Sequence, residues 1–498
     1  MKDALFIGID IGTQGTKAIL CRQNGAVVDE AFCPSILYRP DSETVYEEPE
    51  DIFSSVIKVI SELTSRSYIV AESIYAIGID AQMAGIMGID RDFKVSVPLD
   101  SWLDSRCAEY TELLKNEAGD EALKYSGGQY IHAHAPKILW WKHNNPQAYE
   151  STVKFIEPNC YVAGKLCGLS ASEAFIDYTF LHFNVFSDNI GCRFRENMLT
   201  YFGVEPQKMP RVVSPETIVG TVTEEYAKRC GLPAGVKVIA GCGDTAASSL
   251  GAGITKAGLA YDVAGTASVF ACCTESFVPD VANKALLFSR SVINNLYLPL
   301  SYINGGGLCL EWFSKISGHT LRELDKAAEN RETTDTVFIP HFSGRTFPVD
   351  NRISGAFLGL NHCTEAADMH RAVMESIAFE YMYYYDILRS SGCIKAEPDV
   401  IGVGGGAKSS LFSQIKADAL GIKYITPCKT DSAPVASALL AAYATGFTEE
   451  GLSDIFKPDT ENATVYRPNA EMHSFYRKKS AKYLKLIEGY GDYITGNG

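Results

Sequence analysis

The stretch FIGIDIGTQGTKAIL, residues 6–20, decides how the chain folds. Its first half is an apolar strand pattern with a single acid, Asp10, and a second apolar run follows Lys17. Between the two runs lie glycines and hydroxyl residues, which favour a tight turn. The sequence therefore predicts a hairpin of two strands that carries a carboxylate just before its turn.

A turn of this composition is suited to phosphate. Glycine lets the backbone come close to a ligand, and successive N–H groups with the hydroxyls of Thr13 and Thr16 form a cradle for phosphate oxygens. Asp10 could hold Mg²⁺ through water, because this ion gives up its hydration shell reluctantly. The alternative is a plain hairpin with an acid at its edge, and both interpretations stay open at this point.

Length and composition are those of an ordinary globular protein. The 498 residues are too many for one core and predict two domains of about 250 residues. A net charge of −15 argues against nucleic acid or an anionic membrane as a partner. None of the 14 cysteines forms a C-x-x-C pair, and Asp3 and Asp10 interrupt any apolar leader. We therefore expect reduced cysteines and a cytoplasmic protein.

Strand and helix patterns alternate from the start of the chain, which is typical of an α/β fold. Residues 49–66 begin with proline and acids and continue with helical apolar spacing, and residues 74–80 form a buried strand pattern. The apolar stretch at 435–447 is too short to span a bilayer and predicts a buried helix.

The second half of the chain begins again with a hairpin pattern. When Gly12-Thr13 is placed over Gly265-Thr266, the stretch LAYDVAGTASVFACC (259–273) aligns with the first hairpin without gaps. We expect two similar domains, residues 1–250 and 251–498, that face each other across a cleft and each present a hairpin turn.

A third glycine-rich stretch, VIGVGGGAKSSLFSQIKADAL (400–420), leads from an apolar strand into an amphipathic helix. It is similar to a P-loop in which Ala407 replaces the second glycine, and to a dinucleotide-binding G-x-G-x-x-A turn. The latter requires an acid about 20 residues further on, whereas Asp418 comes too early. A glycine loop that contacts adenine or ribose would use all three stretches together.

Asp244 is the remaining chemical signal. It lies between small residues in AGCGDTAASSLGAG (240–253), directly after an apolar strand. A carboxylate in a glycine-lined turn is a candidate general base. The alternative is an Asp that only caps the helix that follows.

The most specific motif is GAFLGLNHCTEAADMHRAVMESIAFE, residues 355–380. Its glycines, Asp368 and Glu375 have the spacing of the second signature of the FGGY family of carbohydrate kinases, and PKILWWKHNN (136–145) meets the first signature in part, with Lys137 and Trp140. The chain resembles this family over nearly its whole length. The resemblance implies an α/β protein of two ribonuclease-H-like domains, as in the actin- and hexokinase-like ATPases, with a cleft between them.

The resemblance also implies roles for particular residues in binding MgATP. Asp244 corresponds to the catalytic base, and Asp10 serves the metal, through water. The first phosphate loop corresponds to Gly12, Thr13, Gln14 and Lys17, and the second to Gly265 and Thr266. A further nucleotide-contact segment corresponds to Gly307 and Glu311. The adenosine loop corresponds to Gly405, Gly406, Ala407 and Ser410.

The sugar site that the resemblance implies departs from the family pattern. In IGIDAQMAGIM (77–87) Gln82 and Met83 match, but Ala84 replaces the histidine that contacts sugar in xylulokinases. Thr245 stands where an Asn is common. Both changes concern specificity, because a pocket that loses a donor can accept a sugar that lacks the matching hydroxyl.

Two further segments are expected to contribute to the sugar site. DSWLDSRC (100–107) resembles the family's W-x-D-x-R, so Trp102 would wall the sugar while Asp104 and Arg106 bond it or support the pocket. His132 corresponds by position to a substrate-contact tyrosine of glycerol kinases. The alternatives are a core aromatic with a surface ion pair at 102–106, and a loop or a metal-binding H-x-H at 132–134.

These features predict an ATP- and Mg²⁺-dependent kinase of a small ketose or polyol, with xylulose as the best guess. Ribulose, an erythritol-like polyol and glycerol are alternatives within the family. A non-catalytic, actin-like nucleotide-binding protein and a dinucleotide-dependent dehydrogenase are alternatives from other classes. The expected partners are the sugar and ATP, and a homodimer is expected from the habit of the family alone.

Overall fold

The structure is a computed structural model, and it describes residues 4–265, 267–329, 331, 335–428, 430, 432–458 and 460–495. The chain folds into two compact units. The first comprises Met1–Thr255, Phe288–Leu296 and Asp431–Lys457, and the second comprises Lys256–Leu287, Tyr297–Thr430 and Pro458–Gly498. The units are therefore not two consecutive halves of the sequence, because two later segments belong to the first.

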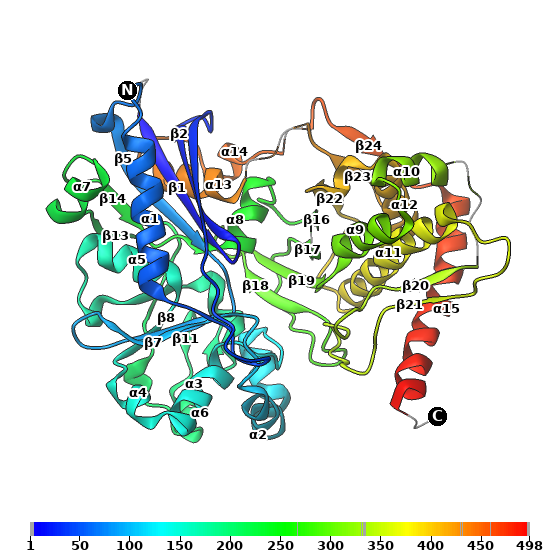
Figure 1. The fold of residues 1–498 in the computed structure, drawn as a ribbon, viewed down its shortest axis with the longest axis horizontal. Helices are drawn as coiled ribbons and strands as arrows, with labels where there is room; N and C mark the ends of the chain where they lie inside the picture. Colours follow the sequence, from blue (N-terminus) through cyan, green and yellow to red (C-terminus); the bar gives the residue numbers. More distant parts are fainter. Residues whose placement is uncertain are drawn as a thin grey trace. The chain divides into compact units, whose positions relative to one another are not determined.

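The first unit is built on a mixed sheet (Figure 1). Its strands, in spatial order, are β13 (Ile218–Thr221), β14 (Lys237–Ile239), β5 (Ile74–Ala81), β1 (Leu5–Gly12), β2 (Gly15–Arg22) and β3 (Val27–Pro34), and the short β15 (Cys242–Gly243) also pairs with β5. The predicted hairpin is confirmed, since β1 and β2 pair antiparallel with Asp10 opposite Lys17.

Helices cover both faces of this sheet. Alternate residues of β1 point to opposite faces, and Ile7 and Phe6 belong to different apolar clusters. The helices that pack in the cluster of Ile7 are α1 (Pro49–Thr64), α5 (Pro158–Cys167) and α7 (Glu224–Cys230). Those in the cluster of Phe6 are α8 (Asp244–Gly251), α13 (Ala433–Ala444) and α14 (Leu452–Ile455).

The helix predicted over 49–66 is α1, which ends at Thr64. Pro49 stands in its first turn, where a missing N–H costs nothing, and two acids follow it near the positive end of the helix. Its buried residues recur at helical spacing from Ile52 to Leu63 and face the sheet.

The buried helix predicted at 435–447 is α13, which packs on β1 and β5 at the centre of the first unit. The approach is close, because a Cβ atom at Gly8 would lie 1.6 Å from the carbonyl oxygen of Pro434. At Gly78 it would lie 2.0 Å from the carbonyl oxygen of Ser437. Two glycines on neighbouring strands therefore admit this helix.

The remainder of the first unit carries the segments that the sequence assigned to the sugar. It contains a sheet of β4 (Tyr46–Glu47), β7 (Val95–Asp100), β6 (Ile86–Ile89) and β8 (Lys154–Ile156). In two further pairs, β9 (Phe175–Asp177) joins β12 (Arg211–Val213) and β10 (Ser187–Asp188) joins β11 (Arg193–Phe194). Its helices are α2 (Ala108–Ser126), α3 (His134–Asn144), α4 (Pro146–Ser151) and α6 (Glu196–Tyr201). Short 3₁₀ turns cover 71–73, 171–173, 178–183 and 206–208.

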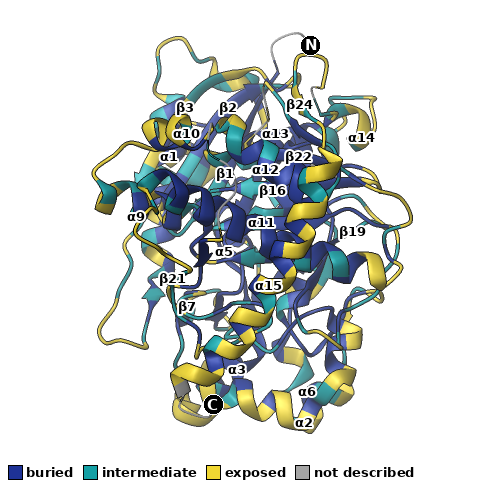
Figure 2. Cartoon of the chain, turned by 90° about the vertical axis from the view of Figure 1, so that its right-hand side faces the viewer, coloured by how far each residue is buried: buried dark blue, intermediate teal, exposed yellow. Residues whose placement is uncertain are grey.

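The second unit has its own sheet, with β24 (Thr464–Tyr466), β23 (Tyr424–Thr426), β22 (Asp399–Val403), β16 (Leu259–Ala264), β17 (Ser268–Cys272) and β19 (Tyr297–Ile303) in spatial order. Its helices are α9 (Gly306–Ser317), α10 (Leu321–Glu329), α11 (Ala366–Ser390), α12 (Ser410–Leu420) and α15 (Ala470–Thr495). β20 (Val337–Ile339) pairs with β21 (Ala356–Leu358), and β18 spans Leu287–Arg290. Figure 2 shows α11 buried along most of its length and α15 exposed on one side.

The two sheets have the same topology. In each, a hairpin (β1–β2, β16–β17) is followed by an antiparallel neighbour (β3, β19), and its first strand pairs in parallel with β5 or β22. A further parallel strand and an antiparallel edge strand complete each sheet. This repetition bears out the predicted pair of similar α/β domains.

The substitution Gly8→Ala should destabilise the first unit by at least about 3 kcal/mol, because the new methyl group would overlap the backbone of Pro434. Urea denaturation followed by circular dichroism measures the change. Gly451→Ala is the matched control, since a Cβ atom there meets only a carboxylate oxygen at 3.9 Å. An equal effect of the two substitutions would contradict the close packing of α13.

Candidate functional site

Three carboxyl groups gather at the carboxyl ends of β1 and β5 in the first unit. Asp10 on β1 lies opposite Asp80 on β5, and β15 pairs with the same end of β5 just before Asp244. Burial raises the pKa of Asp10, against the lowering effects of a hydrogen bond with Asp80 and of the charge of Lys17. Burial, and then the charge of Asp10, raise the pKa of Asp80 well above its usual range and that of Asp244 to about 7.

These acids have little compensating charge of their own. Oδ2 of Asp80 accepts a hydrogen bond from Ser437 at 2.6 Å, whereas none of the described residues donates a hydrogen bond to its buried Oδ1. Lys17, which faces Asp10 across the hairpin, forms an ion pair with Glu30 at 2.8 Å. The electrostatics of this end of the sheet therefore favour a bound cation.

In the second unit, the buried acid Asp262 is fully paired with neighbouring side chains. Asp262 on β16 receives the ammonium group of Lys416 and the hydroxyl groups of Tyr381, at 2.7 Å, and Tyr424, at 2.5 Å. All four side chains are buried. The carboxylate is thus neutralised by its own unit, unlike the cluster around Asp10.

The residues around Asp10 fit a hydrated Mg²⁺ ion better than a metal held by protein ligands alone. Among the described residues, no three His, Cys, Asp or Glu side chains are grouped so as to hold a metal ion. Mg²⁺ commonly keeps several waters and is held by one or two carboxylates together with substrate phosphates. A buried carboxyl pair whose ionisation is disfavoured matches that mode, because a divalent cation would offset its charge.

Asp244 occupies the first position of α8, and the residue is of intermediate exposure. Its Oδ1 accepts hydrogen bonds from the backbone N–H of Thr245 at 2.6 Å and from the hydroxyl of Thr245 at 3.2 Å. Gly243 is the N-cap residue, and no side chain caps the helix. The carboxylate thus satisfies one backbone donor of the first turn of α8, and its pKa near 7 also suits a general base.

The turn of the first hairpin is tied to the sugar segment by hydrogen bonds. The hydroxyl of Thr13 accepts from the indole N–H of Trp102 at 2.9 Å and donates to Oε1 of Gln82 at 3.1 Å. Trp102 itself stays 41% exposed, which leaves a ring face for a ligand. Gly12 is partly exposed and Gln14 fully exposed beside it, while Lys17 is held by Glu30 as described above.

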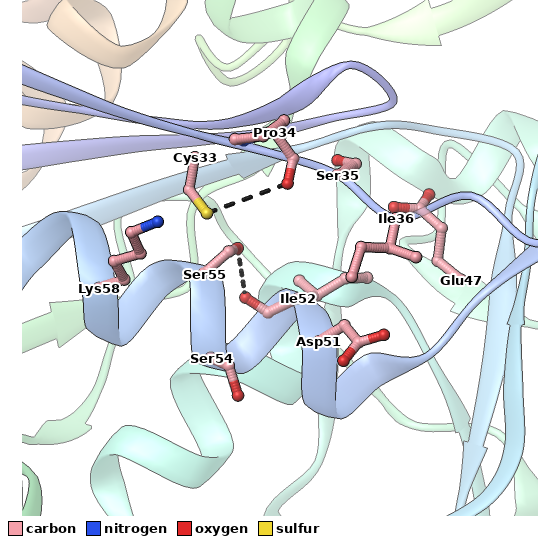
Figure 3. A pocket seen from close by; sticks show the side chains of 10 residues that line it. All are labelled: Cys33, Pro34, Ser35, Ile36, Glu47, Asp51, Ile52, Ser54, Ser55 and Lys58. Carbon is pink, nitrogen blue, oxygen red and sulfur yellow. Dashed lines mark hydrogen bonds between the residues drawn. The ribbon is translucent and has the colours of Figure 1, made fainter.

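Glu47 extends this chain and was missed by the sequence analysis. It accepts a hydrogen bond from Nε2 of Gln82 at 2.6 Å, so both ends of the Gln82 amide are engaged. Burial raises the pKa of Glu47 to about 7 despite this bond. Its side chain lines a cavity of about 190 Å³ with residues of α1 and the end of β3 (Figure 3). In the sequence, Glu47 is one of several acids before α1 and reads only as a helix start.

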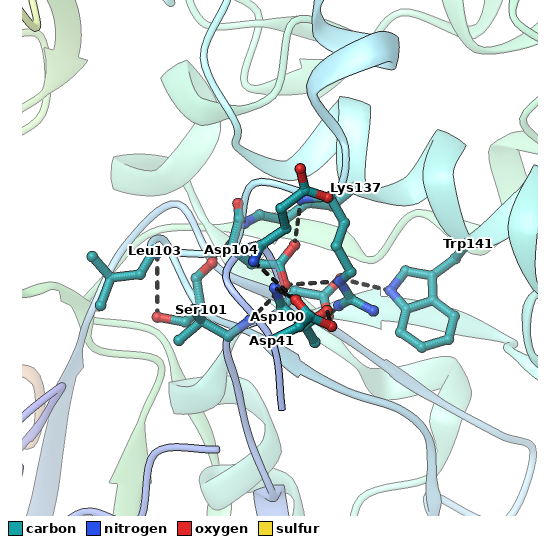
Figure 4. A network of polar contacts seen from close by, with 11 residues as sticks. Asp41, Asp100, Ser101, Leu103, Asp104, Lys137 and Trp141 are labelled. Carbon is teal, nitrogen blue, oxygen red and sulfur yellow. Dashed lines mark hydrogen bonds and ion pairs between the residues drawn. The ribbon is translucent and has the colours of Figure 1, made fainter. Parts of the chain in front are cut away.

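Around Trp102 a buried polar network holds the segment in place (Figure 4). Asp104 accepts from the backbone N–H of Val45 and from Nε of Arg106, both at 2.8 Å. Asp100 accepts from the guanidinium of Arg106 and the indole N–H of Trp141, both at 2.6 Å. Asp104 is 1% exposed, so this geometry favours the supporting role for Asp104.

The two histidines of the H-x-H stretch have different surroundings. His132 is partly exposed, and burial together with the charge of Lys137 lowers its pKa. His134 is fully buried, with its Nε2 2.8 Å from Oε1 of Glu157. Neither belongs to a metal-binding group among the described residues.

Met83 and Ala84 lie near the loop that carries Asp244. A Cβ atom at Gly243 would lie 2.4 Å from the sulfur of Met83, which shows how closely this side chain packs on the loop. Ala84 is buried and has a φ of 64°, in the left-handed region.

The second unit contains a pocket of about 600 Å³ that is lined by five of the nucleotide residues predicted in this unit. Gly265, Gly307, Glu311, Gly405 and Gly406 line it. Ala407 is buried beneath the loop, and the hydroxyl of Ser410 bonds to that of Tyr466 at 3.2 Å. Thr266 lies outside the described residues.

The glycine loop after β22 packs against the end of the second hairpin. Gly404 has a φ of 87°, and a Cβ atom there would lie 2.8 Å from the carbonyl oxygen of Ala264; at Gly406 it would lie 2.6 Å from the Ala264 side chain. The loop and the hairpin thus border one pocket.

Helix α10 adds pocket residues that the sequence did not suggest. Arg322 and Asp325 line the pocket, and Oδ1 of Asp325 lies 2.7 Å from Nε2 of His370 on α11. Apolar walls come from Leu310, Leu321, Met374 and Phe412. These four residues lie on four different helices, so only the fold shows that they face a ligand-sized space.

The repeated α/β units, the carboxyl cluster and the glycine-lined pocket together define a nucleotide-dependent enzyme of the actin- and hexokinase-like ATPase fold. Family models for the N-terminal domain of the FGGY carbohydrate kinases match residues 5–251, and those for the C-terminal domain match residues 262–445. The chain belongs to the FGGY family of carbohydrate kinases.

Individual relatives agree with this assignment. The chain is 26% identical to a xylulose kinase of Bacillus subtilis, over 98% of this chain and 96% of the relative. It is also 26% identical to a gluconokinase of the same organism, over 93% of each chain. A crystal structure of a xyloylose kinase from Brucella ovis superposes with a TM-score of 0.87 at 26% identity, covering 97% of this chain and 99% of the other.

Within the described residues, none of the helices combines the length and apolar character needed to cross a bilayer.

Glu47→Gln should change how stability depends on pH. The folded-state pKa of Glu47 lies near 7, so between about pH 4.5 and 7 the folded chain keeps a proton that the unfolded chain has lost. The free energy of unfolding of the wild type therefore falls as the pH rises from 4.5 to 7. Between pH 5 and 8 the variant should gain about 2 kcal/mol relative to the wild type. Urea denaturation at both pH values measures this gain.

Glu50→Gln is the matched control. Burial acts to raise the pKa of Glu50, but hydrogen bonds from Lys165 and Tyr161 lower it overall, so Glu50 is ionised in both states across this window. It should show no comparable change, and an equal trend in both variants would contradict the burial of an isolated carboxyl at Glu47.

Proposed function

We propose that the chain transfers the γ-phosphoryl group of ATP to a hydroxyl group of a small ketose or polyol, with xylulose as the best candidate. Asp244 acts as the general base. The observation that carries the proposal is the geometry of Asp244: it stands at the start of α8 beside Asp10 and Asp80, is held by Thr245, and has a pKa near 7 through burial and the charge of Asp10.

The proposed step balances simply. A sugar hydroxyl is a weak nucleophile, so Asp244 takes its proton while the oxygen forms a bond to the γ-phosphorus. The bond from that phosphorus to the bridging oxygen breaks, and ADP leaves with the electron pair. Thr245 keeps the carboxylate oriented through its two hydrogen bonds to Oδ1.

Asp10 is the residue proposed to hold Mg²⁺, through water. The ion, when bound, would neutralise charge on the phosphate oxygens. The turn at Gly12 and Thr13 offers backbone N–H groups nearby, and Thr13 is kept in place by Trp102 and Gln82.

The nucleotide is proposed to bind in the pocket of the second unit. Its glycines at 265, 307, 405 and 406 allow backbone groups to approach phosphate and ribose. Leu310 and Phe412 offer an apolar surface for the base, and a volume of about 600 Å³ is within the usual range for small-molecule sites.

The first unit favours a neutral acceptor over an acid such as gluconate. Arg106, the cation nearest in sequence to Trp102, is already neutralised by Asp100 and Asp104. The ammonium group of Lys137 is buried and donates to the carbonyl oxygen of Ser101 at 2.6 Å. Arg106 and Lys137 are therefore already paired within the protein and do not offer a free positive charge to a substrate carboxylate. This supports a ketose or polyol as the acceptor.

Asp244→Asn should reduce kcat about a thousandfold and leave the dissociation constants for sugar and nucleotide within twofold, because only proton removal is lost. The assay is coupled ADP release over a panel of xylulose, ribulose, glycerol, erythritol, arabitol, xylitol and gluconate. In the wild type, kcat/KM for the best sugar should rise with pH and level off above about pH 7, as Asp244 ionises.

Asp92→Asn, at an exposed turn of the first unit, is the control and should keep full activity. Retained turnover in Asp244→Asn would exclude the assigned base. ADP release that no sugar increases would favour a nucleotide-driven switch protein.

Ala84→His should shift the ranking of sugars toward xylulose if this position contacts the acceptor. Histidine tolerates the left-handed backbone of Ala84 better than most residues, so the fold should persist. Ala84→Gly separates backbone from side-chain effects, because it relaxes the backbone without adding a donor. An unchanged ranking of kcat/KM among the sugars in the histidine variant would show that another residue determines the sugar specificity.

A further inference from the structure

A buried polar cluster of the first unit, which the proposed reaction does not use, holds the loop that precedes Asp244. Its members are Asn159 at the start of α5, Asp177 at the end of β9, and Thr179 in the 3₁₀ turn that follows. All three are at most 1% exposed.

The hydroxyl of Thr179 has its orientation fully determined by two hydrogen bonds. It donates to Oδ1 of Asp177 at 2.5 Å, and its lone pair accepts the backbone N–H of Gly243 at 2.9 Å. Oδ1 of Asp177 also accepts the backbone N–H of Thr179 at 2.9 Å. The hydrogen on the hydroxyl therefore points to Asp177, which leaves the oxygen free to accept from Gly243.

Asn159 holds the other end of the same loop. Its Nδ2 donates to the carbonyl oxygen of Ala240 at 3.0 Å and to Oδ2 of Asp177 at 3.3 Å. Asp177 thus joins two side chains that bind the loop backbone at Ala240 and at Gly243. The loop is bound at both ends by groups from distant parts of the chain.

The loop cannot hold this shape through its own residues. Gly241 has a φ of 73°, and a Cβ atom there would lie 1.7 Å from the carbonyl oxygen of Ile79. Gly243 caps α8 without a side chain, so its N–H depends on an outside acceptor. Two glycines next to a catalytic carboxylate make a flexible hinge unless other groups restrain it.

We propose that Thr179 is a positioning residue for Asp244: its hydroxyl, oriented by Asp177, fixes the Gly243 peptide and so sets the direction from which the Asp244 carboxylate reaches the acceptor hydroxyl. Asn159 assists by fixing Ala240. The inference rests on the proposed role of Asp244 as base. Thr179 itself touches neither sugar nor nucleotide in this assignment.

The test is Thr179→Val, which keeps the shape of the side chain and removes the hydroxyl. We expect kcat to fall 10- to 100-fold, with KM for sugar and ATP changed less than twofold, because a misdirected base affects the transition state and not binding. Thr179→Ser restores the hydroxyl and should return kcat to within threefold of the wild type.

Thr152→Val is the matched control, since its hydroxyl is equally buried in the first unit but bonds to Ser96 and Ala148. Its kcat should stay within threefold of the wild type even where its melting temperature falls. An equal loss of kcat in both valine variants, or a loss of Thr179→Val confined to KM, would overturn the proposal. If Thr179→Val does not fold, Asn159→Ala decides: a lower kcat at unchanged KM supports the proposal, and an unchanged kcat overturns it.

A double variant separates this inference from the proposed function. If Thr179 acts through Asp244, then Thr179→Val in the Asp244→Asn background should cost no further activity. If the double variant instead loses activity by the product of the two single losses, Thr179 acts independently of Asp244. An active Asp244→Asn enzyme would instead refute the base itself, whatever the effect of Thr179→Val.

Discussion

The parallel pairing of β1 with β5 is the contact on which the rest of the first unit depends. It places Asp10 opposite Asp80, and the pairing of β15 with the end of β5 brings Asp244 to the same end of the sheet. Helix α13 packs directly on both strands, because Gly8 and Gly78 leave room for its backbone. The result is a cluster of acids whose burial disfavours charge until a cation or a proton compensates it.

The same topology has two different outcomes in the two units. In the second unit, the buried Asp262 is neutralised by Lys416 and two tyrosines, and the space beside the hairpin becomes a pocket lined by glycines and apolar side chains. In the first unit the acids stay uncompensated and the surrounding hydrogen bonds hold the loops that carry them. One topology thus supplies a glycine-lined pocket in one unit and an uncompensated cluster of acids in the other, and the difference lies in which polar side chains the sheet buries.

Much of this was accessible from the sequence. The hairpin at 6–20, its repetition at 259–273, the helix at 49–66 and the buried helix at 435–447 all follow from local patterns of apolar residues, glycines and caps. Asp244 and the glycine loop at 404–407 stood out because a lone acid or a glycine run after a strand is rare. Glu47, Arg322 and the cluster of Asn159, Asp177 and Thr179 did not stand out, since each belongs to a pattern that surfaces and cores share.

The sequence by itself therefore determined the fold class, the family and the acid that acts as the candidate base, because these depend on short-range patterns and on motifs whose spacing is retained in the chain. Only the tertiary structure decided that α13 belongs to the first unit and which residues form hydrogen bonds with Gln82 and Asp104. It also decided which residues hold the Gly241–Gly243 loop in place. Those outcomes depend on residues far apart in sequence whose hydrogen bonds form only after the sheets have assembled. A hydroxyl such as that of Thr179 has no chemical signal until folding places an N–H on one side of it and a carboxylate on the other.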